Sequence, residues 1–443
     1  MTLDYKETVY LPKTEFSMKA GLNKLEPQLL ARWKNINLYE KLREQSKGRE
    51  KFILHDGPPY ANGNLHIGHA LNKILKDVII RSQQMLGKDS NYVPGWDCHG
   101  LPIEWKIEEE YRKKGANKDD VSIIEFRNQC REFAKGWIEI QREEFKRLGI
   151  EGDWNNPYTT MTNAAEAQIV RELGKFLMNG SLYRGAKPVM WSVVEKTALA
   201  EAEIEYHDHI SNTIFVRFKI IKTKHLDEII DANIIIWTTT PWTIPGNRAI
   251  AFSPNDTYAL LEITSADESS LAEVGERIIV AEPLIKRVAD ESGINTYKIV
   301  TTFEGASLKE TVCNHPLYGQ GYDFEVPMLP ATFVEMDTGS GFVHIAPGHG
   351  ADDWELAIEN NITVPDTVGG DGLYYQDVPL FAGNHVFKAD KIVIEELLNC
   401  KSLLSTDTIN HSYPHSWRSK APLIFRNTAQ WFISMDTNEL RNT

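Results

Sequence analysis

The spacing of apolar residues changes near residue 190, and the two parts of the chain predict different secondary structure. In the first part, apolar residues recur every three or four positions, which predicts amphipathic helices. These helices span 26–42, 67–85, 121–148 and 164–178. One stripe of the 121–148 helix is formed by Cys130, Phe133, Trp137, Gln141, Phe145 and Leu148. Short apolar runs at 52–54 and 92–93 predict strands, and strands that alternate with helices indicate a parallel α/β sheet.

After residue 190, short runs rich in β-branched and aromatic residues replace the helical spacing. We expect strands at 213–221, 233–238, 258–263, 277–280, 331–336 and 342–345. Turn signals such as Pro254-Asn255 and Gly319-Gln320-Gly321 separate these runs. The pattern predicts a separate β-barrel-like domain with a few helices that ends near Asn399. Strand-like patterning resumes in the tail from Tyr413 to Met435.

The composition is that of a globular protein without a membrane-spanning segment. Of the 443 residues, 42% are hydrophobic and 25% are charged, and no run of about 18 apolar residues occurs. The first residues lack the apolar core of a secretion signal, and the four cysteines are scattered without a C-x-x-C pair. We therefore expect free thiols and a cytoplasmic location. The net charge of −14 does not support nucleic-acid binding over the whole surface, although it is compatible with a local basic groove.

The strongest chemical signal in the first part is the stretch 57–70, which contains Gly57-Pro58-Pro59-Tyr60 and His66-Ile67-Gly68-His69. It lies between an expected strand and the start of the 67–85 helix. The N–H groups and the dipole at a helix N-terminus attract anions, and glycine lets a ligand approach the backbone closely. His66 and His69 are three residues apart, so their imidazoles share one face. The pattern indicates a nucleotide-phosphate site, although His-x-x-His by itself is more often two exposed histidines at a helix cap.

The stretch resembles the His-Ile-Gly-His motif of class I aminoacyl-tRNA synthetases. The lead-in at 57–63 and the segment Gly-Trp-Asp-Cys-His-Gly-Leu-Pro at 95–102 resemble the isoleucine-specific branch of bacterial type. Gly152-Asp153-Trp154 and the segment at 197–203 agree with that branch. The resemblance covers essentially the whole chain. A valine- or leucine-specific relative is the alternative within the class, but those branches carry different residues before their histidines.

The resemblance implies an α/β fold in which a Rossmann-like parallel-sheet catalytic domain, incomplete in this chain, is interrupted by an inserted β-barrel-rich editing domain. The implied division is an N-terminal arm at 1–45, the first half of the catalytic domain at 46–190, the insertion at 191–405 and a truncated return to the catalytic domain at 406–443. The implied activity is that of an isoleucine–tRNA ligase, which activates isoleucine with ATP and Mg²⁺, transfers it to tRNA(Ile) and hydrolyses misactivated valine. The implied partners are isoleucine, ATP and tRNA(Ile), and we expect a monomer.

For the synthetic site, the resemblance assigns ATP contacts to Gly57, His66, Gly68 and His69. His66 and His69 would contact the phosphates, and Gly68 would leave room for the adenine ring. Pro58 and Asp97 match positions at the amino-acid pocket, where the Asp97 carboxylate would pair with the α-ammonium of isoleucine. Without the family, Asp97 would be interpreted as a turn cap. Asn62 and His99 are weaker candidates for substrate contact.

For the editing site, the resemblance rests on Trp237-Thr238-Thr239-Thr240-Pro241-Trp242-Thr243 and on the segment 339–353. It implies a pocket lined by Thr238, Thr239, Thr240, Asn247, His344 and Asp353. Within this set, the implied catalytic residues are Asp353, Thr239 and His344. His344 would crowd out the isoleucine side chain. Asp353 would bind the α-ammonium of misacylated valine and help to place the hydrolytic water.

Alternatives remain for several of these residues. Three consecutive threonines also suit an ordinary strand, and His349 and Asp352 are more readily structural neighbours than site residues. Editing itself has a physical reason, because one methylene is a weak basis for selection, a limit for which isoleucine-specific synthetases are the standard example.

The chain departs from the family at a paired cysteine motif. Many relatives carry C-x-x-C after the residue that matches Trp191 and again around the residue that matches Trp417, where this chain has Ser192, Glu195, Ser416 and Ser419. Serine is a poor zinc ligand, so we expect no zinc in this chain. His411 and His415 lie nearby in the sequence and are expected to be surface residues.

The second departure concerns segments that the family places after residue 443. These are the Lys-Met-Ser-Lys-Ser loop, the Asp-x-Trp-x-Asp-Ser-Gly segment, the anticodon-binding helices and a C-terminal zinc module. Residues 435–443 resemble the opening of a helix. We expect an incomplete synthetic site and a complete editing site, so that editing is the one complete activity. The alternative is a catalytically silent truncated product.

Overall fold

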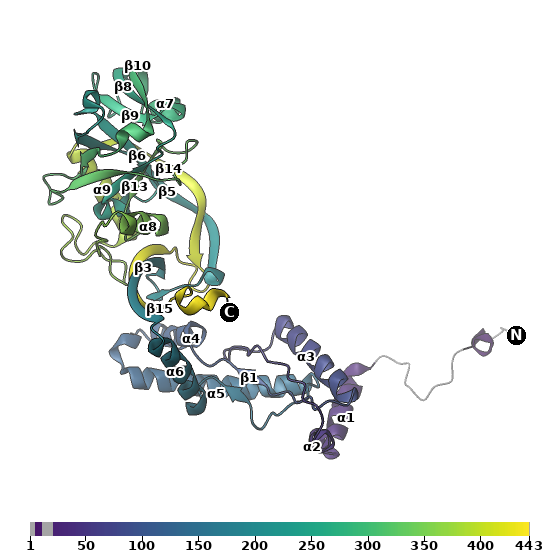
Figure 1. Cartoon of the computed structure of the whole chain (residues 1–443). Helices are drawn as coiled ribbons and strands as arrows, with labels where there is room; N and C mark the ends of the chain where they lie inside the picture. The colour runs from purple at the N-terminus through teal and green to yellow at the C-terminus, as the bar shows by residue number, and fades with distance from the viewer. Residues whose placement is uncertain (1–4, 11–20, 443) are drawn as a thin grey trace. The chain divides into compact units, whose positions relative to one another are not determined.

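The computed structural model describes residues 5–10 and 21–442. The chain divides into two compact units, Met1–Asn179 and Gly180–Thr443 (Figure 1). Each unit has a hydrophobic core of its own. The whole is a mixed α/β fold with one large multi-strand sheet in the second unit. Among the residues described, none of the helices has the length and apolar character needed to cross a membrane.

The first unit is mainly helical. Its helices are α1 (Leu22–Asn35), α2 (Leu38–Ser46), α3 (Ile67–Met85), α4 (Leu101–Lys113), α5 (Ile123–Arg147) and α6 (Asn163–Met178), and its strands β1 (Gly95–Trp96) and β2 (Tyr158–Thr159) pair in parallel. The helices predicted at 67–85, 121–148 and 164–178 are confirmed as α3, α5 and α6. The stretch 26–42 forms two helices rather than one, because Asn37 adopts the left-handed conformation (φ 50°) between α1 and α2.

The strands predicted at 52–54 and 92–93 are wrong. Residues 52–54 and 92–93 lie outside any strand, and β1 begins only at Gly95. Isolated parallel bridges nevertheless join Lys51 to Asp89 and Tyr60 to Asp97. The neighbouring prolines, Pro58, Pro59 and Pro94, have no N–H to contribute to a ladder, so the two segments run in parallel without forming a regular strand pair.

The second unit contains a ten-stranded sheet in the order β10-β8-β9-β6-β5-β11-β12-β7-β13, with β14 paired to β5. The strands are β5 (Ile204–Lys222), β6 (Asn233–Thr238), β7 (Ala249–Phe252), β8 (Thr257–Ala266), β9 (Arg277–Ala281), β10 (Ile294–Glu304), β11 (Val312–Asn314), β12 (Glu325–Pro330), β13 (Phe342–Ile345) and β14 (Leu403–Ser416). The helices are α7 (Ile285–Glu291), α8 (Ala351–Glu359) and α9 (Val386–Asn399).

Five of the predicted strands in this unit are confirmed and one is wrong. The runs at 213–221, 233–238, 258–263, 277–280 and 342–345 lie in β5, β6, β8, β9 and β13. The run at 331–336 is not a strand, because β12 ends at Pro330 and the chain then turns towards β13 through Gly339 and Gly341, both with positive φ. Within the described part of the stretch 435–443, Thr437–Asn442 forms 3₁₀ turns rather than the opening of an α-helix.

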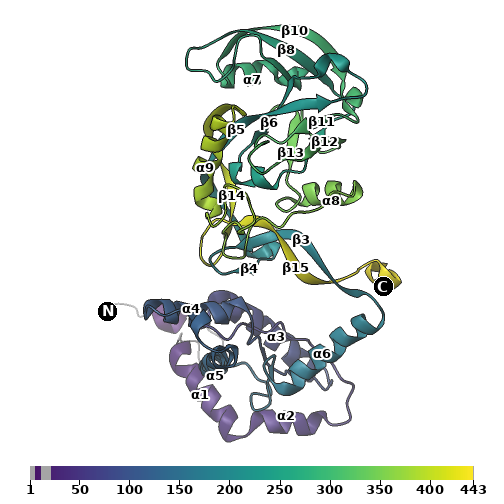
Figure 2. The ribbon, with the colours of Figure 1, turned by 90° about the vertical axis from the view of Figure 1, so that its left-hand side faces the viewer.

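The segments that lead into and out of residues 193–423 run side by side (Figure 2). Strand β3 (Leu182–Ser192) pairs with β15 (Ile424–Ile433), and the short β4 (Thr197–Ala198) completes their sheet. Further along, β5 pairs with β14 over almost the full length of β14. Both pairs are antiparallel, so the two ends of this long segment lie next to each other.

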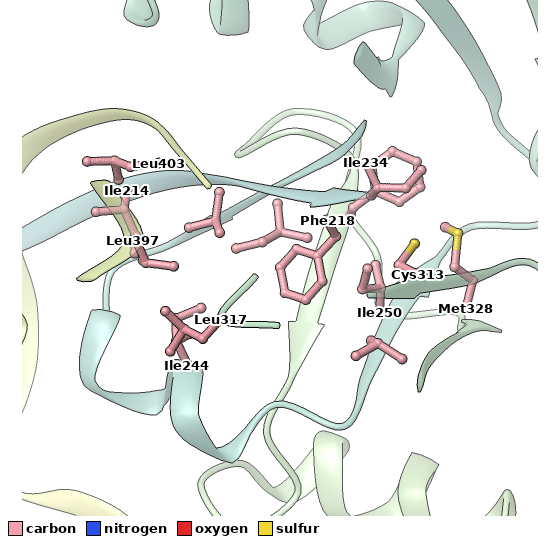
Figure 3. Close-up of a cluster of buried hydrophobic side chains, with 14 of the residues drawn as sticks. Ile214, Phe218, Ile234, Ile244, Ile250, Cys313, Leu317, Met328, Leu397 and Leu403 are labelled. Carbon is pink, nitrogen blue, oxygen red and sulfur yellow. The ribbon is translucent and has the colours of Figure 1, made fainter. Parts of the chain in front are cut away.

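The core of the second unit includes side chains of the segment η5 (Pro241–Gly246), such as Ile244 (Figure 3). Side chains from the sheet, from η5 and from α9 meet there, among them Ile214, Phe218, Ile244, Ile250 and Leu397. All five are 0% exposed. Burial of this kind stabilises by roughly 1.5–3 kcal/mol for each large apolar side chain, and it fixes the backbone on which the second candidate site is built.

Candidate functional sites

His66 is the N-cap of α3. Its Nδ1 accepts the N–H groups of Gly68 (3.1 Å) and His69 (3.4 Å), while its own N–H lies 3.5 Å from Nδ1 of His69. The two imidazole rings stack with their centroids 3.8 Å apart. Because each Nδ1 acts as an acceptor, the assigned neutral tautomer carries its proton on Nε2. Burial, with His66 and Lys73 nearby, lowers the pKa of His69. Two N–H donors are thus presented at the positive end of a helix.

Of the two glycines predicted at this site, Gly68 has a local structural reason, whereas Gly57 has room for a Cβ. A Cβ on Gly68 would lie 3.0 Å from Cε1 of His66, so a side chain there would displace the cap. A Cβ on Gly57 would lie 3.9 Å from Nζ of Lys76. The structure therefore places a lysine ammonium beside Gly57 and an imidazole beside Gly68.

Pro58 and Asp97 lie on two neighbouring segments. The N–H of Asp97 donates to the carbonyl of Pro59 (2.9 Å), and the N–H of Ala61 donates to the carbonyl of Asp97 (3.0 Å). Pro58 also packs against Gly95, where an added Cβ would lie 3.3 Å from Cβ of Pro58. The structure thus brings the two predicted amino-acid contacts together.

The side chain of Asp97 also has the geometry of a turn cap. Its Oδ1 accepts the N–H of His99 (3.2 Å) and lies 3.4 Å from the hydroxyl of Thr160. Asn62 and His99 are engaged within the protein, since Asn62 donates to the carbonyl of Pro102 (3.4 Å) and His99 Nε2 lies 2.8 Å from the carbonyl of Thr160. The turn-cap interpretation and the substrate interpretation are therefore compatible for Asp97, whereas Asn62 and His99 already have protein partners.

A buried charge cluster that sequence reasoning missed supports the start of the 57–70 stretch. The carboxylate of Asp56 pairs with Lys73 and with Lys76 (2.7 Å), and it accepts the hydroxyl of Tyr92 (3.0 Å) and the N–H of Gly95 (3.1 Å). Burial disfavours its charge, but the two lysines outweigh this effect and lower the pKa of Asp56. The cluster ties the residue before Gly57 to α3 and to β1. The sequence gives only a weak signal for it, a lysine that interrupts the apolar stretch of α3.

Four of the candidate editing residues, Thr238, Thr240, Asn247 and His344, are joined through Thr243 in one hydrogen-bonded chain. Nδ2 of Asn247 lies 3.0 Å from Nδ1 of His344, and Nε2 of His344 lies 2.8 Å from the hydroxyl of Thr243. The Thr243 hydroxyl donates to the carbonyl of Thr240 (2.9 Å), whose own hydroxyl lies 3.2 Å from that of Thr238. Thr243 was not predicted, although it closes the same Thr-rich segment. Among the described residues, no hydrogen bond of the Thr239 hydroxyl joins this chain.

His344 is held neutral by its surroundings. It is only 7% exposed, and burial lowers its pKa to about 3. Since an amide N–H donates to Nδ1, the ring proton is assigned to Nε2, which donates to Thr243. Both ring nitrogens are therefore occupied by protein groups. The side chain can shape a pocket wall, but it has no free nitrogen with which to take up a proton.

Asp353 lies in the first turn of α8, and its Oδ2 accepts the N–H of Ala346 (2.7 Å). Burial raises its pKa to about 7, and the neighbouring Asp352 adds to this effect. The hydrogen bond anchors the carboxylate to the chain immediately after β13, two residues from His344. A largely buried carboxyl whose pKa is raised to near neutral pH is a common feature of reactive sites.

His349 is engaged as a structural residue. Its Nδ1 lies 2.9 Å from the carbonyl of Phe425, and its Nε2 lies 2.6 Å from the hydroxyl of Thr367. Its ring also packs on Trp242 with the centroids 4.9 Å apart. Burial lowers its pKa to about 4. His349 thus fastens η5 to β15, which agrees with its expected role as a neighbour of the site.

The four positions at which the resemblance implies paired cysteines lie close together around Glu195. Oε1 of Glu195 accepts the hydroxyl of Ser416 (2.6 Å) and the N–H of Ser419 (3.1 Å), and the hydroxyl of Ser192 accepts the N–H of Glu195 (3.2 Å). Glu195 is 3% exposed. Serine hydroxyls are weak zinc donors, and a single carboxylate does not supply four. Within the described ranges, no cluster of three His, Cys, Asp or Glu side chains could hold a metal ion.

Comparisons with known proteins show the family to which the chain belongs. A family model described as tRNA synthetases class I (I, L, M and V) matches residues 28–443. The chain belongs to this family. The isoleucine–tRNA ligase of Pelagibacter ubique (strain HTCC1062) is 57% identical over 98% of this chain and 48% of its own length. The isoleucine–tRNA ligase of Gluconobacter oxydans (strain 621H) is 53% identical over 98% of this chain and 46% of its own length.

The chain therefore spans about half the length of the curated relatives it matches. Among solved structures, the ternary complex of LeuRS from Agrobacterium radiobacter K84 with tRNA and LeuAMS matches 90% of this chain and 48% of that chain, with 18% identity and a TM-score of 0.35. The family assignment rests on the family model and not on this weak structural likeness.

Proposed function

We propose that this chain is the N-terminal part of an isoleucine–tRNA ligase, with an amino-acid and ATP site in the first unit and an editing site in the second. The observation that carries the proposal is the 57% identity to a curated isoleucine–tRNA ligase over 98% of the chain. The geometry supports it, because four of the implied editing residues share one hydrogen-bonded chain, and Pro58 and Asp97 lie on neighbouring segments. The first unit is then the first half of a Rossmann-like catalytic domain.

The pairing of β3 with β15 and of β5 with β14 supports an inserted domain. A domain inserted into a parent chain needs two linkers whose ends lie close together, and these strand pairs have that property. On this proposal, the ten-stranded sheet of the second unit is the body of the editing domain. The strands β3 and β15 lead back to the catalytic domain.

In the proposed synthetic reaction, a carboxylate oxygen of isoleucine attacks the α-phosphorus of ATP, and the bond to the pyrophosphate oxygen breaks. The products are isoleucyl-adenylate and pyrophosphate. Asp97 holds the α-ammonium, and the Nε2–H groups of His66 and His69 donate to phosphate oxygens as charge develops. Mg²⁺ bound to the nucleotide neutralises phosphate charge. Positioning and electrostatics supply the catalysis, and no side chain needs to transfer a proton.

In the proposed editing reaction, water attacks the carbonyl carbon of valyl-tRNA(Ile), and the bond to the ribose oxygen breaks. The products are valine and tRNA(Ile), with one water consumed. Ionised Asp353 pairs with the α-ammonium of the substrate and helps to place the water. The neutral ring of His344 forms the wall that a valine side chain clears and an isoleucine side chain does not. Thr238, Thr239, Thr240 and Asn247 line the rest of the pocket. The proposal assigns no zinc to the junction around Glu195.

Two measurements on the 443-residue chain test this proposal. A non-hydrolysable isoleucyl-adenylate analogue should raise the midpoint of thermal unfolding, and the valyl and leucyl analogues should raise it less. Equal or larger shifts with valyl or leucyl analogues would assign the chain to another branch, and no shift with any of them would mean that it is catalytically silent at this site. The second measurement is isoleucine-dependent ATP–pyrophosphate exchange, which should be weak because the 443 residues span only about half the length of the curated relatives. Robust exchange would refute that part.

A further inference from the structure

Two side chains of α5, Gln141 and Glu144, form hydrogen bonds to the 57–70 stretch. Neither belongs to a recognised motif. Gln141 is 0% exposed. Its Nε2 donates to the carbonyls of Tyr60 (3.0 Å) and Gly63 (2.7 Å), and its Oε1 accepts Nε1–H of the Trp96 indole (2.9 Å). A buried amide with both of its N–H groups and its oxygen in use is strongly fixed, because each lost bond would leave a buried polar group unpaired.

The three partners of Gln141 lie on the two segments that form the candidate amino-acid pocket. Tyr60 is two residues after Pro58, and Trp96 is the residue before Asp97. Tyr60 and Asp97 also form a parallel bridge with each other. One amide therefore braces the segments that carry Pro58 and Asp97, in addition to the two backbone hydrogen bonds that join them directly.

Glu144 lies one turn further along α5 and holds the next part of the same stretch. One carboxylate oxygen accepts Nδ2–H of Asn64 (2.7 Å), and the other accepts the N–H of Leu65 (2.9 Å). Leu65 is followed at once by His66, the N-cap of α3. Glu144 thus fixes the backbone at the point where the helix and its histidine cap begin.

We infer that Gln141 and Glu144 are positioning residues with separate tasks, Gln141 for the amino-acid pocket and Glu144 for the histidine cap that faces the nucleotide. Residues i and i+3 share a face of a helix, so one rigid element reaches both sites. Preorganisation of this kind reduces the ordering that a ligand must impose when it binds. A purely structural role would instead weaken both sites together.

Hydrogen exchange tests the positioning without any ligand. Gln141→Met keeps the size of the side chain and removes the three hydrogen bonds, and Gln129→Met is the matched control on the same helix, where Gln129 Oε1 accepts only the hydroxyl of Tyr111 (2.8 Å). We expect the amides of residues 61–65 to exchange at least tenfold faster in Gln141→Met than in the control, while the amides of α5 keep their protection in both. Equal exchange at 61–65 would overturn the inference.

A second variant tests the carbonyl partners of Gln141 apart from its indole partner. It also keeps the inference testable if Gln141→Met does not fold. Gln141→Glu keeps an acceptor for Trp96 but, when ionised, has no donor for the carbonyls of Tyr60 and Gly63. We expect faster exchange at 61–65 with the Trp96 indole N–H still protected. Loss of protection at Trp96 alone would contradict the assignment.

The division of tasks rests on the proposed function and is tested by calorimetric titration of the 443-residue chain with isoleucine and with ATP. Gln141→Met should weaken isoleucine binding at least tenfold and change ATP binding less than threefold, and Glu144→Gln should do the reverse. Equal losses for both ligands in both variants would overturn the division. If the unaltered chain binds neither ligand, the proposed synthetic site fails, and the exchange experiment still decides whether the two residues position the loop.

Discussion

Nε2 of His344 lies 2.8 Å from the hydroxyl of Thr243, and its Nδ1 lies 3.0 Å from the amide nitrogen of Asn247. Both ring nitrogens are therefore used within the protein, and burial lowers the pKa of the ring to about 3. A histidine held in this way acts through its shape and its position. Its orientation depends on a threonine outside the three consecutive threonines that the family resemblance singles out.

Replacement of Thr243 should relax the selectivity of editing. Thr243→Val keeps the shape but leaves Nε2–H of His344 without an acceptor, which costs about 1–3 kcal/mol for a buried donor. We expect the ring to reorient and the ratio of valyl-tRNA(Ile) to isoleucyl-tRNA(Ile) hydrolysis to fall severalfold. Thr243→Ser retains the hydroxyl and should retain the ratio. An unchanged ratio in Thr243→Val would show that Thr243 does not position His344.

Asp353 should give the editing reaction a pH dependence near neutrality. Its pKa in the folded chain is raised from 3.8 to about 7, chiefly by burial. The reaction needs the ionised form to hold an ammonium, so hydrolysis should rise with pH and level off above about pH 7. Asp353→Asn should lower the rate at least tenfold and abolish this dependence. Asp352→Asn should keep the rate above pH 7 and move the rise to lower pH, because the Asp352 charge adds to the raised pKa of Asp353. A flat pH profile in the unaltered chain would contradict this assignment.

The same carboxyl should oppose folding at high pH. Because its folded-state pKa lies above its unfolded value, its contribution to stability is complete below about pH 4 and is lost as the pH rises through about 7. Asp353→Asn should therefore unfold at a higher denaturant concentration than the unaltered chain at pH 8, and the difference should shrink at pH 5. Denaturant unfolding of both proteins at pH 8 and pH 5 measures this difference in stability. Lower stability of Asp353→Asn at pH 8 would contradict the raised pKa.

The sequence predicts the long regular elements better than the contacts that hold the sites. The apolar spacing located α3, α5 and α6, because each is long and strongly periodic. It placed Gln141 on a buried stripe without revealing that its amide binds three backbone and side-chain groups from distant segments. Such partners come from the tertiary fold, and no local spacing encodes them.

The errors in the strands have a related cause. Residues 52–54 and 331–336 have strand-like composition, but pairing depends on the neighbouring segment and on the turns that follow, which composition does not encode. For the candidate sites, the motifs predicted which segments carry the chemistry, such as 57–70 and 237–243. The supporting residues Asp56, Thr243 and Glu144 emerged only from the structure.

Asp56 should be important for the stability of the first unit. Its carboxylate pairs with the ammonium groups of both Lys73 and Lys76, and Lys73 is 2% exposed. Removing one partner of a buried ion pair costs about 3–5 kcal/mol, so Asp56→Asn should lower the free energy of unfolding by an amount of this order. Glu143→Gln, which breaks the exposed pair with Lys146, should have little effect. An equally small change in the free energy of unfolding for Asp56→Asn and Glu143→Gln would show that the Asp56 cluster does not stabilise the first unit.

Buried histidines should make the second unit sensitive to acid. Burial lowers the pKa of His315 to about 3 and that of His349 to about 4, each below the ordinary 6.5. With folded-state values below the unfolded ones, stability is complete above about pH 6.5 and is lost as the pH falls towards 4, by about 1.4 kcal/mol per pH unit for each histidine. His315→Phe, which keeps an aromatic ring beside Tyr322, should give a shallower decline in urea unfolding between pH 6.5 and 5. An equal decline of the unfolding free energy with falling pH in His315→Phe and in the unaltered chain would contradict this prediction.

The most direct test of the account is the hydrolysis of aminoacyl-tRNA by the 443-residue chain itself. Valyl-tRNA(Ile) and isoleucyl-tRNA(Ile) are each incubated with the unaltered chain and with Asp353→Asn at pH 8, and the remaining ester is measured over time. The account predicts that the unaltered chain hydrolyses the valyl ester faster than the isoleucyl ester and that Asp353→Asn loses this activity. Equal rates for the two esters, or valyl ester hydrolysis that survives in Asp353→Asn, would contradict it.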